Sequence, residues 1–162
     1  MWVSANTRNE QNDKGGQELI IYYNDDILKP EKPHFMDAGV DLKTAEDIVL
    51  PPKELKLVRT GVKVKIDFGY VGLLKDRSGL AARGLMSLGG VIDAGYTGEV
   101  KALLINTSDE TITFQKGDRV IQLITARIDT GLDIVKGQPI EETARGSNGF
   151  GSTGLAGIPR VD

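Results

Sequence analysis

Glycine is spread along the whole chain, and this distribution constrains the fold more than any other feature of the sequence. The 162 residues include 20 glycines, which separate short apolar runs from one another. Glycine is readily accommodated in tight turns, and short apolar runs between turn residues are typical of β-strands. Along 62–66 the apolar residues also recur at every second position, with lysines between them. The pattern predicts an all-β fold with many turns.

The predicted strands follow one another closely, with one short helix among them. We expect strands at Leu19–Tyr23, Val40–Lys43, Ile48–Leu50, Leu55–Leu57, Val62–Ile66, Tyr70–Lys75, Gly90–Ile92, Glu99–Asn106, Thr111–Phe114, Arg119–Ile128 and Leu132–Val135. The helix is expected near Ser78 to Arg83, with Ser78 as its N-cap. Because strands do not alternate with helices, a parallel Rossmann-type sheet is not expected. The pattern favours a sandwich or barrel of short antiparallel strands.

The order of segments along the chain indicates one folded domain between two tails. The length of the chain fits a single domain that can bury a real core. Residues 1–17 are polar and predict a mobile N-terminal tail. Residues 18–143 contain the predicted strands and form the expected β-barrel domain. From Ala144 the strand pattern stops, and residues 144–162 form a glycine-rich C-terminal segment.

Composition excludes several classes of site and partner. Cysteine is absent and His34 is the only histidine, so disulfides, thiolate metal sites and a zinc centre are not expected. The net charge is −3 with acids and bases interspersed, which argues against a nucleic-acid partner. No apolar run approaches the ~20 residues of a membrane span, and no membrane partner is expected.

The C-terminal segment ARGSNGFGSTG, from Ala144 to Gly154, carries residue types suited to phosphate. Glycines allow backbone N–H groups to converge on an anion. The Arg145 guanidinium can grip phosphate as a fork, and Ser152 and Thr153 add hydroxyl donors. The aromatic face of Phe150 could cover a base. Composition alone favours the alternative, a flexible tail without such a role.

Two further segments offer a phosphate site and a carboxylate for catalysis. In KDRSGLA (75–81), the first amides of the short helix and Arg77 could bind an anion, although an ordinary helix start is an equal alternative. In GGVIDAGYTGE (89–99), Asp93 could orient or deprotonate a water. The alternative for Asp93 is a turn aspartate that bonds its own backbone. Tyr96 could pack internally or face a ligand.

Two weaker segments complete the set of candidates. DAGVDL (37–42) could supply a magnesium carboxylate in Asp41. KGDRVIQL (116–123) could be a turn that leads into a strand, with Asp118 and Arg119 as a structural pair. Neither segment specifies a function by itself.

Taken in order, these five segments resemble the five sequence motifs of the trimeric dUTPase family. DAGVDL resembles the first motif, DRSGLA the second, GGVIDAGYTGEV the third, GDRVIQLI the fourth and RGSNGFGSTG the fifth. The resemblance extends from about Met36 to Gly154. One departure is Asp76, where the family often has proline before Arg-Ser-Gly.

The resemblance implies a fold, a reaction and a metal. The fold would be a distorted jelly-roll or β-clip barrel in a homotrimer. The reaction would be magnesium-dependent hydrolysis of dUTP to dUMP and pyrophosphate, by attack of an oriented water on the α-phosphate. Asp41 would hold Mg²⁺ through water. Each active site would lie between chains: the first, second and fourth motifs come from one chain, the third from the next and the fifth from the remaining one.

The resemblance also implies individual roles. Asp93 would orient the attacking water, and Tyr96 would pack under the deoxyribose and exclude a 2′-hydroxyl. The backbone from about Leu85 to Val91 would recognise the uracil edge. The other expected substrate-binding residues are Arg77, Ser78, Gly79 and Gln122 for the α- and β-phosphates, Gly90 and Val91 for the base, and Arg145, Phe150, Gly151, Ser152 and Thr153 for the γ-phosphate and the outer face of the uracil.

Two alternative functions differ in the residues that they require. A dCTP deaminase, a related family, would carry a catalytic glutamate ten residues after the hairpin aspartate, but that position is Leu103, which cannot shuttle protons. A non-catalytic module that binds dUTP and signals to a partner would not require Asp93. An enzyme acting in the cytoplasm of a bacterium or a phage-infected cell remains the favoured interpretation.

Overall fold

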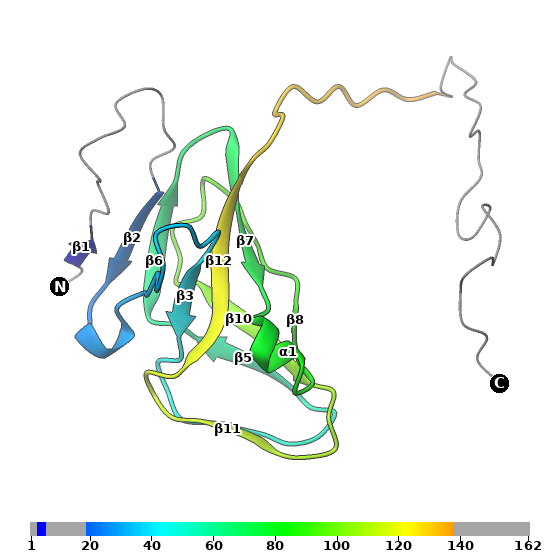
Figure 1. The fold of residues 1–162 in the computed structure, drawn as a ribbon. Helices are drawn as coiled ribbons and strands as arrows, with labels where there is room; N and C mark the ends of the chain where they lie inside the picture. Colours follow the sequence, from blue (N-terminus) through cyan, green and yellow to red (C-terminus); the bar gives the residue numbers. More distant parts are fainter. Residues whose placement is uncertain (1–2, 6–18, 138–162) are drawn as a thin grey trace. The chain divides into compact units, whose positions relative to one another are not determined.

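The computed structural model describes residues 3–5 and 19–137. The chain divides into two units, Met1–Thr130 and Gly131–Asp162, of which the first contains all the described strands. These strands are β1 (Val3–Ala5), β2 (Leu19–Tyr23), β3 (Val40–Lys43), β4 (Ile48–Leu50), β5 (Leu55–Arg59), β6 (Val62–Ile66), β7 (Tyr70–Lys75), β8 (Leu85–Leu88), β9 (Val91–Ile92), β10 (Lys101–Asn106), β11 (Ile112–Phe114) and β12 (Arg119–Arg127). A 3₁₀ turn, η1 (Asp26–Leu28), and one short helix, α1 (Ser78–Ala81), are the described helical elements (Figure 1).

The strands form four small antiparallel sheets. Their strand orders are β1-β2-β6, β5-β10-β8, β11-β4 and β3-β12-β7-β9. Neighbours in these sheets are mostly distant in sequence, as in β12, which lies between β3 and β7. The result is a distorted jelly-roll barrel, and the predicted all-β class of short antiparallel strands with one short helix is confirmed.

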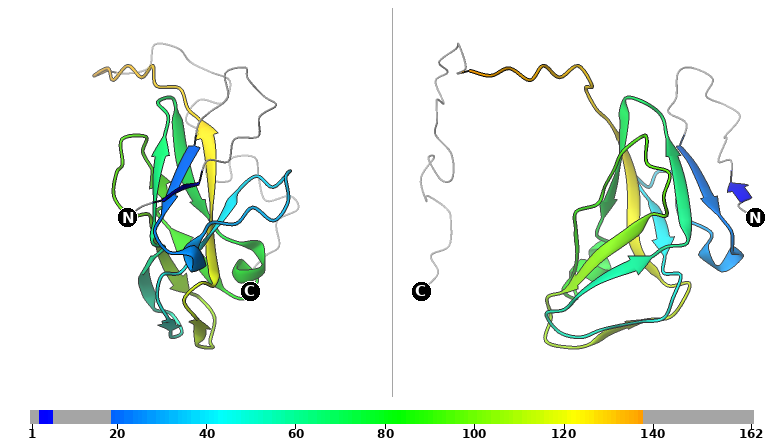
Figure 2. Two further views of the ribbon diagram at one scale, coloured as in Figure 1. Left: turned by 90° about the vertical axis from the view of Figure 1, so that its left-hand side faces the viewer. Right: turned by 180° about the vertical axis from the view of Figure 1, so that it is seen from behind.

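Figure 2 shows the small sheets arranged around a common interior, and buried apolar side chains from them form one hydrophobic core there. Alternation along the strands produces it: Val62, Val64 and Ile66 of β6 point inward, while Lys63 and Lys65 lie more exposed. Because successive side chains in a strand point to opposite faces, this spacing buries one face of each strand. The long strand β12 adds apolar residues to the same core and thereby fixes the positions of its own polar side chains.

The N-terminus differs from expectation. Val3–Ala5 forms β1, which pairs antiparallel with β2, with Val3 opposite Tyr23 and Ala5 opposite Ile21. These residues were expected to belong to a mobile tail, because the surrounding segment is polar. Strand pairing needs backbone groups more than apolar side chains, so three residues can add to the edge of β2 without an apolar pattern.

The strand predicted at Leu132–Val135 is wrong. No strand is assigned within residues 131–137, and Leu132, Ile134 and Val135 are 78%, 91% and 82% exposed. The side chains suit a strand, but within the described residues no neighbouring strand pairs with this segment.

In the same described ranges, no helix is long and apolar enough to cross a membrane.

Candidate functional site

A cluster of charged side chains surrounds Asp41 on β3. Arg77, at the start of α1, places Nε 3.1 Å from Asp41 Oδ2. Arg119, at the start of β12, places Nη1 3.4 Å from the same oxygen. The Arg77 Nη1 also donates to the Arg119 carbonyl at 2.9 Å. Strand β12 pairs with both β3 and β7, and this arrangement brings the three side chains together.

Glu31 and Lys43 extend the cluster. The Glu31 carboxylate lies 2.6 Å from Lys43 Nζ and 3.5 Å from Arg119 Nη1. The hydrogen bond from Lys43 lowers the pKa of the Glu31 carboxyl below its ordinary value, and the charges of Lys43, Arg119 and Arg77 add to the effect. Three cations and two carboxylates therefore meet here, which leaves one net positive charge for an anion.

Asp76 connects the loop before α1 to two strands. Its carbonyl accepts a hydrogen bond from Gln122 Nε2 at 2.8 Å. Its carboxylate accepts one from the backbone N–H of Ser87, in β8, at 2.7 Å. Gln122 lies in register between Asp41 of β3 and Lys75 of β7. The predicted phosphate loop is thus held from both sides.

The start of α1 differs from the prediction. Arg77, not Ser78, is the N-cap residue, with extended backbone and no side-chain cap hydrogen bond. The Arg77 side chain is engaged with Asp41 instead. The helix ends at Ala81, two residues before the predicted end, and Gly84 follows with φ +84°. Ser78 and Gly79 are consequently the first residues of the helix, where N–H groups have no intrahelical acceptor, and both are exposed.

The second group of candidate residues lies on the hairpin after β9. A backbone hydrogen bond from Tyr96 N to the Asp93 carbonyl, at 3.0 Å, closes the turn. The Asp93 carboxylate is exposed and has no hydrogen-bond partner among residues 3–5 and 19–137. By contrast, the carboxylates of Asp37 and Asp118 do accept from nearby backbone N–H groups. The turn-aspartate alternative therefore does not describe Asp93.

Tyr96 is fixed to the hairpin although it is 43% exposed. Its hydroxyl donates to the Glu99 carbonyl at 2.8 Å. The Glu99 carboxylate accepts from the Gly61 N–H at 2.9 Å and from Arg59 Nε at 3.2 Å. The hairpin is thus tied to the turn between β5 and β6, and Tyr96 is not an internal packing residue.

A shallow cleft of about 340 Å³ runs beside this hairpin. The residues that line it are Leu57, Leu88, Gly90, Val91, Ile92, Asp93, Tyr96, Lys101 and Leu103. Gly90 has φ +90°, and its carbonyl accepts from Leu74 N at 2.7 Å. A Cβ at this position would lie 3.0 Å from Cβ of Leu74, so glycine allows β9 to approach β7 closely here. Asp93, Tyr96, Gly90 and Val91 therefore share one cleft.

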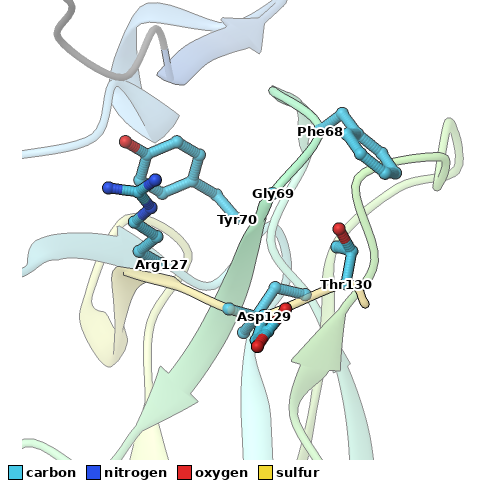
Figure 3. Close-up of a pocket in the computed structure, with 7 residues that line it drawn as sticks. Phe68, Gly69, Tyr70, Arg127, Asp129 and Thr130 are labelled. Atoms are coloured by element: carbon cyan, nitrogen blue, oxygen red, sulfur yellow. The ribbon is translucent and has the colours of Figure 1, made fainter. Parts of the chain in front are cut away.

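A larger hollow of about 700 Å³ contains none of the predicted site residues. It lies between the turn after β6 and the end of β12, with Tyr70 and Arg127 on one side and Phe68 on the other (Figure 3). Nothing in the sequence analysis indicated it.

The structure thus gathers the predicted residues into two groups, the Asp41 cluster with Arg77 and Gln122, and the hairpin cleft with Asp93. The expected C-terminal residues Arg145, Phe150, Gly151, Ser152 and Thr153 lie outside the described residues. Three members of the first group, Arg119, Glu31 and Lys43, were not among the predicted site residues. Arg119 was expected to pair with Asp118, but Asp118 precedes β12 and its carboxylate accepts from the Gln115 N–H, whereas Arg119 contacts Asp41 and Glu31. Glu31 lies outside the motifs, so no sequence signal marked it.

Comparisons with known proteins agree on one family. A dUTPase family profile matches residues 25–154. The deoxyuridine 5′-triphosphate nucleotidohydrolase of Mycobacterium marinum is 48% identical over 134 residues, which cover 77% of this chain and 86% of the relative. The corresponding Nocardia farcinica protein is 46% identical over 132 residues, covering 79% of each chain.

A solved structure has the same fold. The dUTPase of Staphylococcus bacteriophage 80alpha, a point mutant with dUpNHpp, superimposes with a TM-score of 0.74 at 32% identity, covering 85% of this chain and 98% of the other. Together with the matched profile and the curated relatives, this likeness extends over most of the folded part of the chain. The chain belongs to the dUTPase family.

Proposed function

We propose that this protein hydrolyses dUTP to dUMP and pyrophosphate, with Asp93 orienting the water that attacks the α-phosphate. The observation that carries the proposal is the Asp93 carboxylate, which is exposed on the hairpin beside the cleft and has no partner among the described residues. A general base must be free to bond a water rather than its own backbone. We place the reaction in the cytoplasm of a bacterium or phage-infected cell, in keeping with the bacterial and phage relatives.

The charged cluster around Asp41 is suited to the phosphates. Arg77 can turn its guanidinium from Asp41 toward an anion, and Ser78 and Gly79 present a hydroxyl and two backbone N–H groups. Gln122 holds the loop through the Asp76 carbonyl. Phosphoryl transfer depends mainly on positioning and charge stabilisation, which such donors supply without covalent chemistry.

The donor set fits magnesium held mostly by water and phosphate. Within the described residues, no group of three or more His, Cys, Asp or Glu side chains gathers, so this part of the chain forms no closed cage for a metal ion. We assign Asp41 as the carboxylate that would hold a hydrated ion, since it lies in the same cluster as the two guanidinium groups that would attract the phosphates. Mg²⁺ suits such a site because it retains several waters, and it would neutralise charge on the triphosphate. A related phage phi11 dUTPase structure describes a structural Mg(II) ion.

The hairpin cleft is suited to the nucleoside. Gly90 and Val91 bring backbone groups to the cleft wall, where they can recognise the uracil edge. The Tyr96 ring, fixed through Glu99, would pack under the deoxyribose and leave no room for a 2′-hydroxyl. Leu103, at the position where a deaminase would need glutamate, is one of the apolar residues of this cleft. The nearest alternative reaction therefore lacks its proton-transfer group.

An exposed apolar grid supports assembly into a homotrimer. Across β5-β10-β8, Leu57, Leu103 and Leu88 form one row in register, and Leu55, Ile105 and Met86 form the next. Leu55 and Leu57 are 55% and 54% exposed in the single chain. The first row also lines the cleft that holds Asp93. A second copy that covers this grid would therefore place its own residues beside the cleft, as a shared site requires.

The C-terminal segment would complete a site on a neighbouring chain. We assign residues 144–162 as a lid, with Arg145, Ser152 and Thr153 on the γ-phosphate, Gly151 among them, and Phe150 over the uracil.

The decisive experiment is release of pyrophosphate from dUTP, UTP, dTTP and dCTP in the presence of magnesium. We expect turnover of dUTP far above the other three. Asp93→Asn should keep nucleotide binding and lose about 10²–10⁴-fold in kcat, the usual contribution of a general base. Equal rates on all four nucleotides, or an Asp93→Asn variant with near wild-type turnover, would overturn the assignment. Deamination of dCTP in the same samples, measured by chromatography, would indicate the alternative reaction.

A further inference from the structure

The ring of Tyr96 lies directly against Gly98, two residues further along the hairpin. A Cβ added to Gly98 would lie 2.6 Å from Cζ and 3.0 Å from Cε2 of Tyr96, and closer still to its hydroxyl oxygen. These are its three nearest atoms, so the ring occupies the space that any larger residue at position 98 would fill. Gly98 does not lie in the left-handed region, which means that its need for glycine comes from the ring and not from the backbone.

The hydroxyl group of Tyr96 is held in place as well. The Tyr96 hydroxyl is held by the Glu99 carbonyl at 2.8 Å, and Glu99 is itself fixed by the Gly61 N–H and by Arg59. The ring is therefore restrained at its tip by a hydrogen bond and near its tip by the surface of Gly98. A Cβ at Gly98 must displace the hydroxyl from Glu99, because both contacts involve the same end of the ring.

We propose that Gly98 is a specificity-determining residue: the bare Cα of Gly98 and the Glu99 carbonyl form a seat that sets the position of the Tyr96 ring against the sugar. Gly98 acts through Tyr96 and touches no substrate, so it is a positioning residue. The inference rests on the proposed role of Tyr96 in excluding a 2′-hydroxyl. The Tyr96 ring can exclude the 2′-hydroxyl of ribose only if the ring stays in place, since a displaced ring would leave space for the larger sugar.

The test compares kcat/KM for dUTP and for UTP in Gly98→Ala and in a matched control, Gly95→Ala. Gly95 lies in the same hairpin, and a Cβ there would meet nothing within 4 Å. Because discrimination against one added hydroxyl is commonly about 10²-fold, we expect Gly98→Ala to lower the dUTP to UTP ratio by about 10-fold or more. Gly95→Ala should keep the wild-type ratio, and circular dichroism should show both variants folded.

A double-mutant cycle separates the seat from general damage to the hairpin. Tyr96→Ala removes all three of the atoms nearest to the added Cβ, so Gly98→Ala should have no further effect on the ratio in that background. A Gly98→Ala variant with an unchanged ratio, or one that lowers it equally with and without the ring, would overturn the proposal.

Two further outcomes keep the result interpretable. If Gly98→Ala does not fold, Tyr96→Phe serves in its place, because it removes the hydrogen bond to Glu99 without adding an atom. It should lower the ratio of kcat/KM for dUTP to that for UTP several-fold. An unchanged ratio would then overturn the proposed role of the Gly98 and Glu99 contacts. If wild-type enzyme discriminates dUTP from UTP but Tyr96→Ala leaves the ratio unchanged, the proposed role of Tyr96 itself fails. Failure of the Gly98 seat alone leaves that role intact.

Discussion

Arg77 Nε lies 3.1 Å from Asp41 Oδ2, and the two side chains are only 27% and 14% exposed. Each group is therefore the main compensating charge of the other before any nucleotide arrives. The two residues are also the ones that we assign to phosphate and to hydrated magnesium. When Mg²⁺ and triphosphate bind, each partner of this ion pair would gain a new counter-ion. The magnesium cation would lie beside Asp41, and the phosphate anion would lie beside Arg77.

Asp41→Asn should weaken both the binding of magnesium and the stability of the fold. Loss of the charge removes the counter-ion of Arg77 and Arg119, and we expect a decrease of about 1.5–3 kcal/mol in the free energy of unfolding. The Mg²⁺ concentration for half-maximal rate should rise. The control is Asp37→Asn in the same segment, because Asp37 only accepts a backbone hydrogen bond from His34 and asparagine keeps that acceptor. Chemical denaturation and magnesium titration of the rate measure both effects; equal behaviour of the two variants would contradict the assignment of Asp41.

Asp76→Ala should loosen the phosphate loop, whereas Asp76→Asn should not. Alanine leaves the Ser87 N–H without the acceptor that now lies 2.7 Å away, at a cost of about 1–3 kcal/mol. Asparagine retains an oxygen at the same place. We expect a raised KM for dUTP and a lower Tm with alanine, and near wild-type values with asparagine. Should both variants weaken dUTP equally, the charge of Asp76 rather than its hydrogen bond would be responsible.

Glu31→Gln should reduce stability at neutral pH and lose this effect in acid. The hydrogen bond from Lys43 lowers the folded-state pKa of Glu31, so its ionised form favours the folded state above the ordinary glutamate pKa of about 4.3. That contribution disappears as the pH falls through the lowered pKa. The effect should be small, because 45% of the side chain is exposed. Thermal unfolding from pH 7 to pH 3 measures it, with Glu110→Gln, which has no side-chain partner among the described residues, as the control.

Sequence analysis predicted most of the strands because alternation along each strand reports one buried face. Alternation does not mark β8, which only the family resemblance implied, as part of a strand from about Leu85 to Val91. Its Leu-Met-Ser-Leu run has apolar residues on both faces: Leu85 is buried, while Met86 and Leu88 are 46% and 42% exposed. That second face belongs to the apolar grid, which local patterns do not reveal. Likewise, Asp41 and Arg77 were each recognised, but their ion pair depends on the register of β12 between β3 and β7. The strand predicted at Leu132–Val135 was wrong for a different reason: apolar composition suits a strand but does not show whether a second strand is there to pair with it.

Leu103→Glu should dissociate the proposed homotrimer. Leu103 lies at the centre of a row between Leu57 and Leu88, so a neighbouring copy that covers the grid would bury the new charge among apolar side chains. Val49→Glu is the control, because Val49 is 60% exposed on β4, outside the grid. Native mass spectrometry should show monomers for Leu103→Glu and trimers for Val49→Glu. Trimers in both would remove the grid from the interface.

Complementation of two inactive variants tests whether each site is shared between chains. Asp93→Asn lacks the carboxylate that we propose orients the water, and a chain truncated after Thr143 lacks the proposed lid. If the hairpin and the lid of a site came from one chain, no mixed trimer could contain a complete site. If they come from different chains, a random mixture at equal amounts places an intact hairpin and an intact lid together in about a quarter of the sites of a threefold ring.

Co-refolding the two variants should therefore recover about a quarter of the wild-type rate, by the same symmetry argument. Mixing preformed trimers should recover little until subunits exchange, which separates assembly from any direct rescue in solution. Each variant refolded alone provides the background rate. Native mass spectrometry must show that mixed trimers have formed, since the two chains differ in mass. Mixed trimers without any recovered activity would exclude the shared site, and they would do so even if pyrophosphate release had already established dUTP as the substrate.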